Sequence, residues 1–126
     1  MFLFSKPDIE QLIKNFESNE VDHIPVAKLF IPRTSFIWLV TEVDPNEPLN
    51  ATALYDAGDG VISLAEVNLG EILHRGYELG PMVQRDPRFV GKYPVSVYLR
   101  AALHYGYITD QDLLINRFKN PFGLSP

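Results

Sequence analysis

Five polar residues between positions 74 and 88 have side chains that could recognise or transform a charged group: His74, Arg75, Arg85, Asp86 and Arg88. Arginine binds carboxylates and phosphates through paired hydrogen bonds. A histidine exchanges protons with a carboxylate when the fold brings the two within hydrogen-bond reach. Two hypotheses therefore stay open for these residues: a patch that binds an anion or an acidic partner, or the site of a small enzyme or ligand-binding domain.

Arg85 and Asp86 also have a purely structural interpretation. If they end a strand, their side chains point to opposite faces of the sheet and make two separate contacts. One of these contacts would be an ion pair between Arg85 and a neighbouring carboxylate, which would pin the loop at Pro87. This interpretation requires no ligand.

The sequence contains none of the common catalytic or nucleotide-binding motifs. There is no phosphate-binding loop, nucleophile elbow, dinucleotide-binding glycine pattern or zinc-protease HExxH. The chain has no cysteine, and its three histidines, His23, His74 and His104, are widely separated. Asp56 and Asp59 lack the spacing of a calcium-binding loop. We therefore predict no catalytic residue, no metal site and no cofactor.

The charge is negative overall and unevenly distributed. The net charge is -5, and residues 1–73 carry four basic against twelve acidic side chains, whereas residues 74–100 carry five basic against two acidic. An acidic chain is poorly suited to binding the phosphate backbone of nucleic acids. The uneven distribution of charge could instead orient a protein partner. The acidic first part also leaves open that the chain mimics DNA and occupies a DNA-binding protein.

Length and hydropathy predict one cytoplasmic domain spanning residues 1–126. A chain of 126 residues is long enough to bury a single core without disulfides or metals. No apolar run approaches the roughly 20 residues that cross a bilayer. The first residues, MFLFSKPD, lack the basic start and cleavage site of a signal peptide. No membrane association is expected, and the oligomeric state is left open.

The segment 26–43 should form the centre of the fold. Two runs rich in β-forming apolar residues, 26–31 and 36–43, flank the turn-like sequence Pro-Arg-Thr-Ser, which predicts a hairpin. The second run is apolar on both alternating faces, so its strand should be central and covered on both sides. Trp38 lies midway along it, which favours a core position over a ligand-binding wall.

Other strands are expected at 52–56, 61–67 and 82–85, with 44–50 as a loop and 57–60 as a tight turn. Helix signals are also present. Ser5 and Asp8 form a capping box before an apolar stripe of Ile9, Leu12, Ile13 and Phe16. Capping residues or prolines start three further helices: Asn68 one that ends at Gly76, Pro94 one that ends at Gly106, and Thr109 the last. The tail 121–126 should be loose.

These elements predict an α+β fold. We expect a mostly antiparallel sheet of four or five strands, flanked by the N-terminal helix, a short middle helix and a C-terminal pair of helices.

The order of elements and several phrases resemble the family known as domain of unknown function 2958. The similar phrases are LFSKPDIEQLI, VAKLFIP, WLVTEVDP, LGEI, RG, QRDPRF and PVSVY, and the resemblance spans roughly Leu3 to Leu99. Residues 1–99 would thus be a family-like core and residues 100–126 a helical extension. The chain differs from the family in its short turn at 57–60 and in the helix after Tyr107.

The resemblance implies an accessory protein of a phage, plasmid or other mobile element, in a setting often close to antirestriction genes. Together with the acidic charge and the missing catalytic motifs, it favours a non-catalytic interaction protein. Such a protein would bind a host protein and could blunt a defence system such as restriction or CRISPR. The alternative is a small enzyme or ligand-binding domain that uses His74, Arg75, Arg85 and Asp86.

Overall fold

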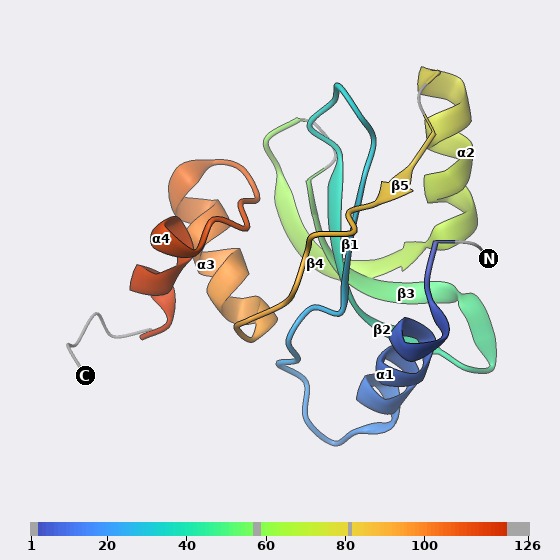
Figure 1. Ribbon diagram of the computed structural model, residues 1–126, viewed down its shortest axis with the longest axis horizontal. Coiled ribbons are helices and arrows are strands. Elements are labelled where there is room, and N and C mark those ends of the chain that lie inside the picture. The colour runs from blue at the N-terminus through green and yellow to red at the C-terminus, as the bar shows by residue number, and fades with distance from the viewer. Residues whose placement is uncertain (1–2, 57–58, 81, 121–126) are drawn as a thin grey trace.

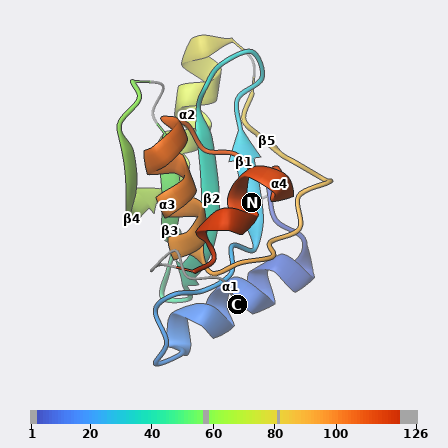
Figure 2. The same ribbon diagram turned by 90° about the vertical axis from the view of Figure 1, so that its left-hand side faces the viewer.

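The computed structural model describes residues 3–56, 59–80 and 82–120. Over these residues the chain has an α+β fold, as predicted, in which helices cover both faces of a five-stranded antiparallel sheet (Figures 1 and 2). In chain order the elements are α1 (Lys6–Glu17), β1 (Ala27–Phe30), β2 (Ile37–Asp44), β3 (Glu47–Asp56), β4 (Ile62–Asn68), α2 (Leu69–Leu79), β5 (Gln84–Arg85), α3 (Val95–Tyr105), α4 (Asp112–Ile115) and a 3-10 turn (Asn116–Phe118).

The sheet order is β4-β3-β2-β1-β5, so β2 is the central strand. Its alternating side chains enter two different cores. Trp38 and Val40 pack with residues of α1 and α2, whereas Leu39 packs with residues of α3 and α4. Trp38 is only 5% exposed. The predicted hairpin, the central position of its second strand and the coverage of both its faces are all confirmed.

Strand β3 is longer than the sequence predicted. Residues 44–50 were expected in a loop because they contain two prolines and two acids, but β2 continues to Asp44 and β3 begins at Glu47. The register with β2 jumps from Val43↔Ala51 to Asp44↔Glu47, and the pairing with β4 begins only at Asn50. Pro48 therefore lies where neither neighbour requires its missing N–H group.

Helix α1 begins with the predicted capping box. The Ser5 hydroxyl accepts from the Asp8 N–H, and the Asp8 carboxylate accepts from the Ser5 N–H. The buried face differs from the predicted apolar stripe, however: Asp8, Leu12 and Asn15 are buried, and Phe16 is 41% exposed. Two polar side chains can be buried here because each has hydrogen-bond partners in the rest of the fold.

Helix α2 is capped by Asn68, as predicted, but it does not end at Gly76. It continues to Leu79 and ends where Gly80 adopts φ 98°. Gly76 belongs to the buried side of the helix with Leu69 and Ile72. A glycine within a helix lowers its stability only modestly, so packing of this side against the sheet outweighs the local stop signal.

The C-terminal part contains the expected pair of helices. Helix α3 follows Pro94 and ends at Gly106, as predicted. The cap of α4 was wrongly predicted: the helix begins after Gln111, and the Thr109 hydroxyl instead accepts from the Gln111 N–H. The first half of the predicted turn 57–60 and the predicted tail 121–126 lie outside the described residues. Within the described ranges, no helix combines the length and the hydropathy needed to cross a membrane.

Candidate functional site

A cleft of about 340 Å³ lies between α2 and the sheet, on the face that carries Trp38. This volume is within the range of ordinary ligand and side-chain binding sites. We call it the aromatic cleft. Its lining consists of Phe36, Trp38, Tyr55, Glu66, Val67, Asn68, Glu71, Ile72 and Arg75.

Three aromatic side chains form the floor of the aromatic cleft: Phe36 just before β2, Trp38 of β2 and Tyr55 of β3. Phe36 and Trp38 are two positions apart on an extended segment, so their rings share one face. The rings stack with centroids 5.9 Å apart and an interplanar angle of 18°. Tyr55 is the β3 partner of Trp38. Because the three side chains are aromatic, this floor is largely apolar.

One side of α2 forms the opposite wall. Asn68, Glu71, Ile72 and Arg75 follow the spacing of a single helix face. Asn68 is fixed by its capping bond, in which its side-chain oxygen accepts from the Glu71 N–H at 3.0 Å. Ile72 is buried against the sheet, whereas Glu71 and Arg75 are exposed at the rim. The cleft thus combines an apolar floor with polar groups at its mouth.

Of the five residues singled out in the sequence, only Arg75 lines this cleft. Its guanidinium lies over the Phe36 ring, 5.7 Å from the centroid, in cation–π geometry. His74, the next residue back, is largely exposed, and its Nε2 lies 3.7 Å from the exposed Glu78 carboxylate. This pair is exposed and lies outside the aromatic cleft.

Arg85 has a different role. Its Nε donates to Asp8 Oδ2 at 2.7 Å and its Nη2 to Asp8 Oδ1 at 3.0 Å, while Nη1 donates to the Asp86 carbonyl. Both oxygens of the Asp8 carboxylate therefore accept from one edge of the guanidinium, and the pair ties β5 to the N-terminus of α1. The sequence suggested that Arg85 could pair with a carboxylate; the identity of that carboxylate could not be read from it.

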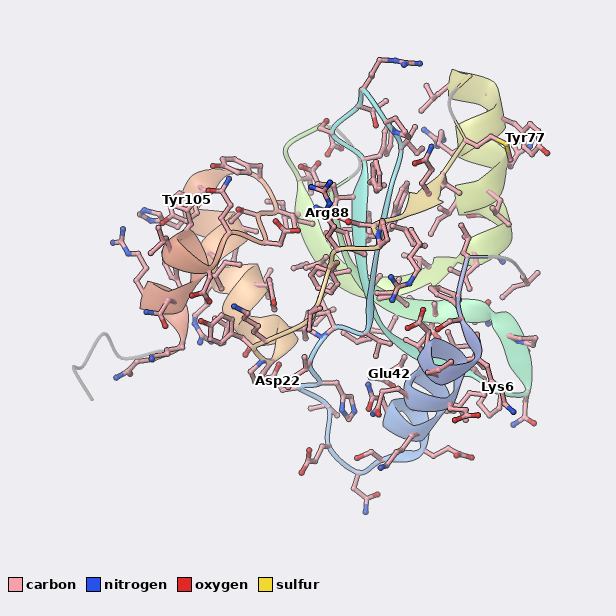
Figure 3. All side chains as sticks on the ribbon, viewed as in Figure 1. Lys6, Asp22, Glu42, Tyr77, Arg88 and Tyr105 are labelled. Carbon is pink, nitrogen blue, oxygen red and sulfur yellow. The ribbon has the colours of Figure 1, made fainter. Side chains whose placement is uncertain are left out.

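Asp86 and Arg88 line another hollow, on the side of the sheet that faces α3 and α4. Asp86 lies 3.6 Å from Lys28 Nζ, and its other oxygen accepts from the Arg88 N–H. Arg85 and Asp86 thus make separate contacts, as expected for neighbours at the end of a strand. Figure 3 shows Arg88 on the side of the sheet towards α3, whereas Tyr77 of α2 lies beyond the opposite side. The five residues therefore do not form one patch.

A hollow beside α1 contains a buried histidine, His23. Its Nε2 has no hydrogen-bond partner among the described residues. Glu42 of β2 is close enough for the two side chains to interact electrostatically. Within the described ranges, no three histidine or acidic side chains converge in a way that could hold a metal ion.

The sequence did not point to several residues that build these sites. Phe36 and Tyr55 read simply as strand residues, and Glu71 as a capping residue. Their contribution to a cleft depends on strand pairing, since Tyr55 reaches Trp38 only through the β2–β3 register. The one local signal was alternation, which places Phe36 on the same face as Trp38.

Comparison with known proteins gives one match. A family model with the description "Protein of unknown function (DUF2958)" matches residues 3–109. The matched range covers most of the chain, including every strand and the helices α1, α2 and α3, and it extends past Leu99. No curated protein and no solved structure matches the chain.

Proposed function

This chain belongs to the DUF2958 family of proteins of unknown function, and we propose that it is a non-catalytic interaction protein that binds a partner protein at the aromatic cleft. The proposed setting is a phage, plasmid or other mobile element, as the sequence resemblance implies. The proposed partner is a host protein, with restriction and CRISPR effectors as the first candidates.

The observation that carries this proposal is the aromatic cleft itself. Aromatic side chains in a preformed hollow are the usual anchoring sites of protein interfaces, because they offer a large apolar contact at a low entropic cost. Phe36, Trp38 and Tyr55 provide such a floor, and the polar groups of α2 provide a rim. The acidic chain, with its net charge of -5, would favour a partner of opposite charge.

The polar residues nearby support binding rather than turnover. Arg85 is engaged by Asp8, and Asp86 by Lys28 and the Arg88 N–H. A general acid or base must lie within hydrogen-bond reach of the substrate. The aromatic cleft is lined by no histidine, and its glutamates, Glu66 and Glu71, are both exposed.

A pull-down tests the proposal. The full chain, immobilised through a tag, is incubated with a bacterial lysate and separately with purified restriction and CRISPR effector complexes. We expect one protein to be retained in a stoichiometric amount. Phe36→Ala should abolish this retention, since the substitution removes about a third of the aromatic floor.

Phe16→Ala is the matched control, because Phe16 is exposed on α1 and does not line the aromatic cleft. It should retain the partner as the unchanged chain does. Thermal unfolding of both variants establishes that they are folded. Recovery of no stoichiometric partner, or equal loss of the partner with both variants, would contradict the proposal.

A further inference from the structure

We propose that the partner binds as an extended strand added to the outer edge of β4, with one of its side chains in the aromatic cleft. This inference rests on the proposed function, because it describes how that partner is held. The binding surface is the edge of the sheet next to the aromatic cleft.

The outer edge of β4 is open. Among the described residues β4 is last in the sheet order, and Figure 2 shows it at the margin of the sheet with no strand beyond it. It is seven residues long, so it offers a row of backbone N–H and C=O groups that face away from β3. The opposite edge, β5, has only two residues and is followed closely by Pro87. Only β4 can accept a strand of useful length.

The residues of β4 do little to protect this edge. Natural edge strands are commonly guarded by lysine, proline or a bulge. β4 contains no lysine, arginine or proline, and its register with β3 runs without a shift. Leu64, Ala65 and Glu66 in its middle are exposed, and Leu64 is an apolar side chain with 40% exposure. Glu66 is the single charged residue of the strand.

The aromatic cleft is continuous with this edge. Ser63, Ala65 and Val67 pair with Tyr55, Ala53 and Ala51 of β3, on the face that carries Trp38. Val67 and Asn68 also line the cleft. A strand added beside β4 places every second side chain on this face. One of those side chains would lie over the aromatic floor.

This geometry specifies the chemistry of the occupant. Backbone pairing requires an extended segment without proline, and the aromatic floor favours a large apolar side chain at alternate positions. A basic residue opposite Glu66 would form a favourable cross-strand pair. The occupant is therefore an extended segment of the partner in which apolar residues alternate with polar residues. At least one of the polar residues is basic.

A synthetic peptide tests this inference directly. The probe is an acetylated and amidated heptapeptide in which leucine alternates with threonine and arginine stands at each end. One control peptide carries glutamate in place of arginine at both ends. The other keeps arginine but carries N-methyl groups on the backbone nitrogens along one edge. Fluorescence of Trp38, the only tryptophan, reports occupation of the cleft. Amide hydrogen exchange reports pairing at β4.

We expect the arginine peptide to shift the Trp38 emission saturably and to slow exchange at alternate amides of residues 62–68. The N-methylated peptide should do neither. Glu66→Gln should weaken binding about two- to fivefold, the usual range for one cross-strand charge pair. Glu78→Gln makes the same charge change on α2 outside the cleft and should leave binding unchanged.

Three results would overturn the inference: no saturable change with the arginine peptide, stronger binding of the glutamate peptide, or a dimer of the chain that Leu64→Lys dissociates. The last result would mean that a second copy covers the edge. Failure here is distinct from failure of the proposed function. A partner retained in the pull-down and unaffected by Glu66→Gln and Leu64→Lys would leave the function standing and remove this binding mode.

Discussion

Asp8 and Arg85 are 77 positions apart in the chain and form a two-bonded ion pair, with N–O distances of 2.7 and 3.0 Å. The pair joins the first turn of α1 to the edge strand β5. β5 has only two residues paired with β1, so few backbone bonds hold it in place. The ion pair therefore fixes both the start of α1 and the path of the chain between α2 and α3.

Removing either partner of this pair should destabilise the fold. We expect Asp8→Asn to lower the free energy of unfolding by about 2–3 kcal/mol, the usual cost of losing a hydrogen bond to a charged and partly buried group. Arg85→Lys should also destabilise, because an ammonium cannot make two parallel bonds to a carboxylate. Urea unfolding measures both effects. Glu10→Gln, an exposed change on the same helix, should have little effect.

The same pair predicts a loss of stability in acid. Burial would raise the pKa of Asp8, but the hydrogen bonds from Arg85 and the Ser5 N–H, together with the Arg85 charge, hold the pKa below its ordinary value. A lowered pKa gives stability that is fully present above the unfolded-state value of about 3.9 and is lost as the pH falls through the folded-state value. The stability difference between the unchanged chain and Asp8→Asn should be constant from pH 7 to 5 and shrink below about pH 4. A difference that does not change with pH would contradict this.

The sequence correctly predicted the structural features that depend only on residues close together in the chain. The capping box at Ser5, the cap at Asn68 and the hairpin around 32–35 are local, so a few positions suffice to specify them. The central position of β2 followed from two apolar faces on one strand. These predictions succeeded because pattern and tertiary structure agree at these sites.

Predictions failed where a distant partner reverses the local preference. The apolar stripe was expected to form the buried face of α1, but Asp8 and Asn15 are buried as well. Arg85 pairs with Asp8, and the Asn15 amide donates to the Thr41 carbonyl at 2.9 Å. Thr41 is the extra residue of a bulge between the pairs at Val40 and Glu42, which leaves its carbonyl available. No local pattern contains that information. The aromatic cleft could not be predicted for the same reason, since it requires Phe36 and Tyr55 to meet α2.

Gly91 should tolerate no side chain. A Cβ atom at this position would overlap the carbonyl oxygen of Pro25 and lie 2.7 Å from Cγ2 of Ile24. The obstacle is backbone, which cannot move aside as the end of a flexible side chain does. We expect Gly91→Ala to lower the free energy of unfolding by about 3 kcal/mol, at the upper end of overpacking effects.

Val90→Ala provides the comparison for Gly91→Ala, because Val90 is the preceding residue and is 74% exposed. It should change the free energy of unfolding by less than about 0.5 kcal/mol. Equal stability of the two variants in thermal unfolding would show that the segment at Gly91 can move away from Pro25.

Glu42 should reduce stability at neutral pH. Figure 3 shows it beside α1. Burial raises the pKa of Glu42, and the nearby His23 offsets the rise only in part. An acid whose pKa is raised on folding destabilises the fold above that pKa, and the cost disappears as the pH falls and the group is protonated in both states. Glu42→Gln should therefore raise the melting temperature at pH 7 by up to about 4 °C, and the gain should vanish near pH 3. Glu17→Gln, an exposed change on α1, should give no such gain, and an unchanged or lower melting temperature of Glu42→Gln at pH 7 would show that its charge is stabilised by its surroundings.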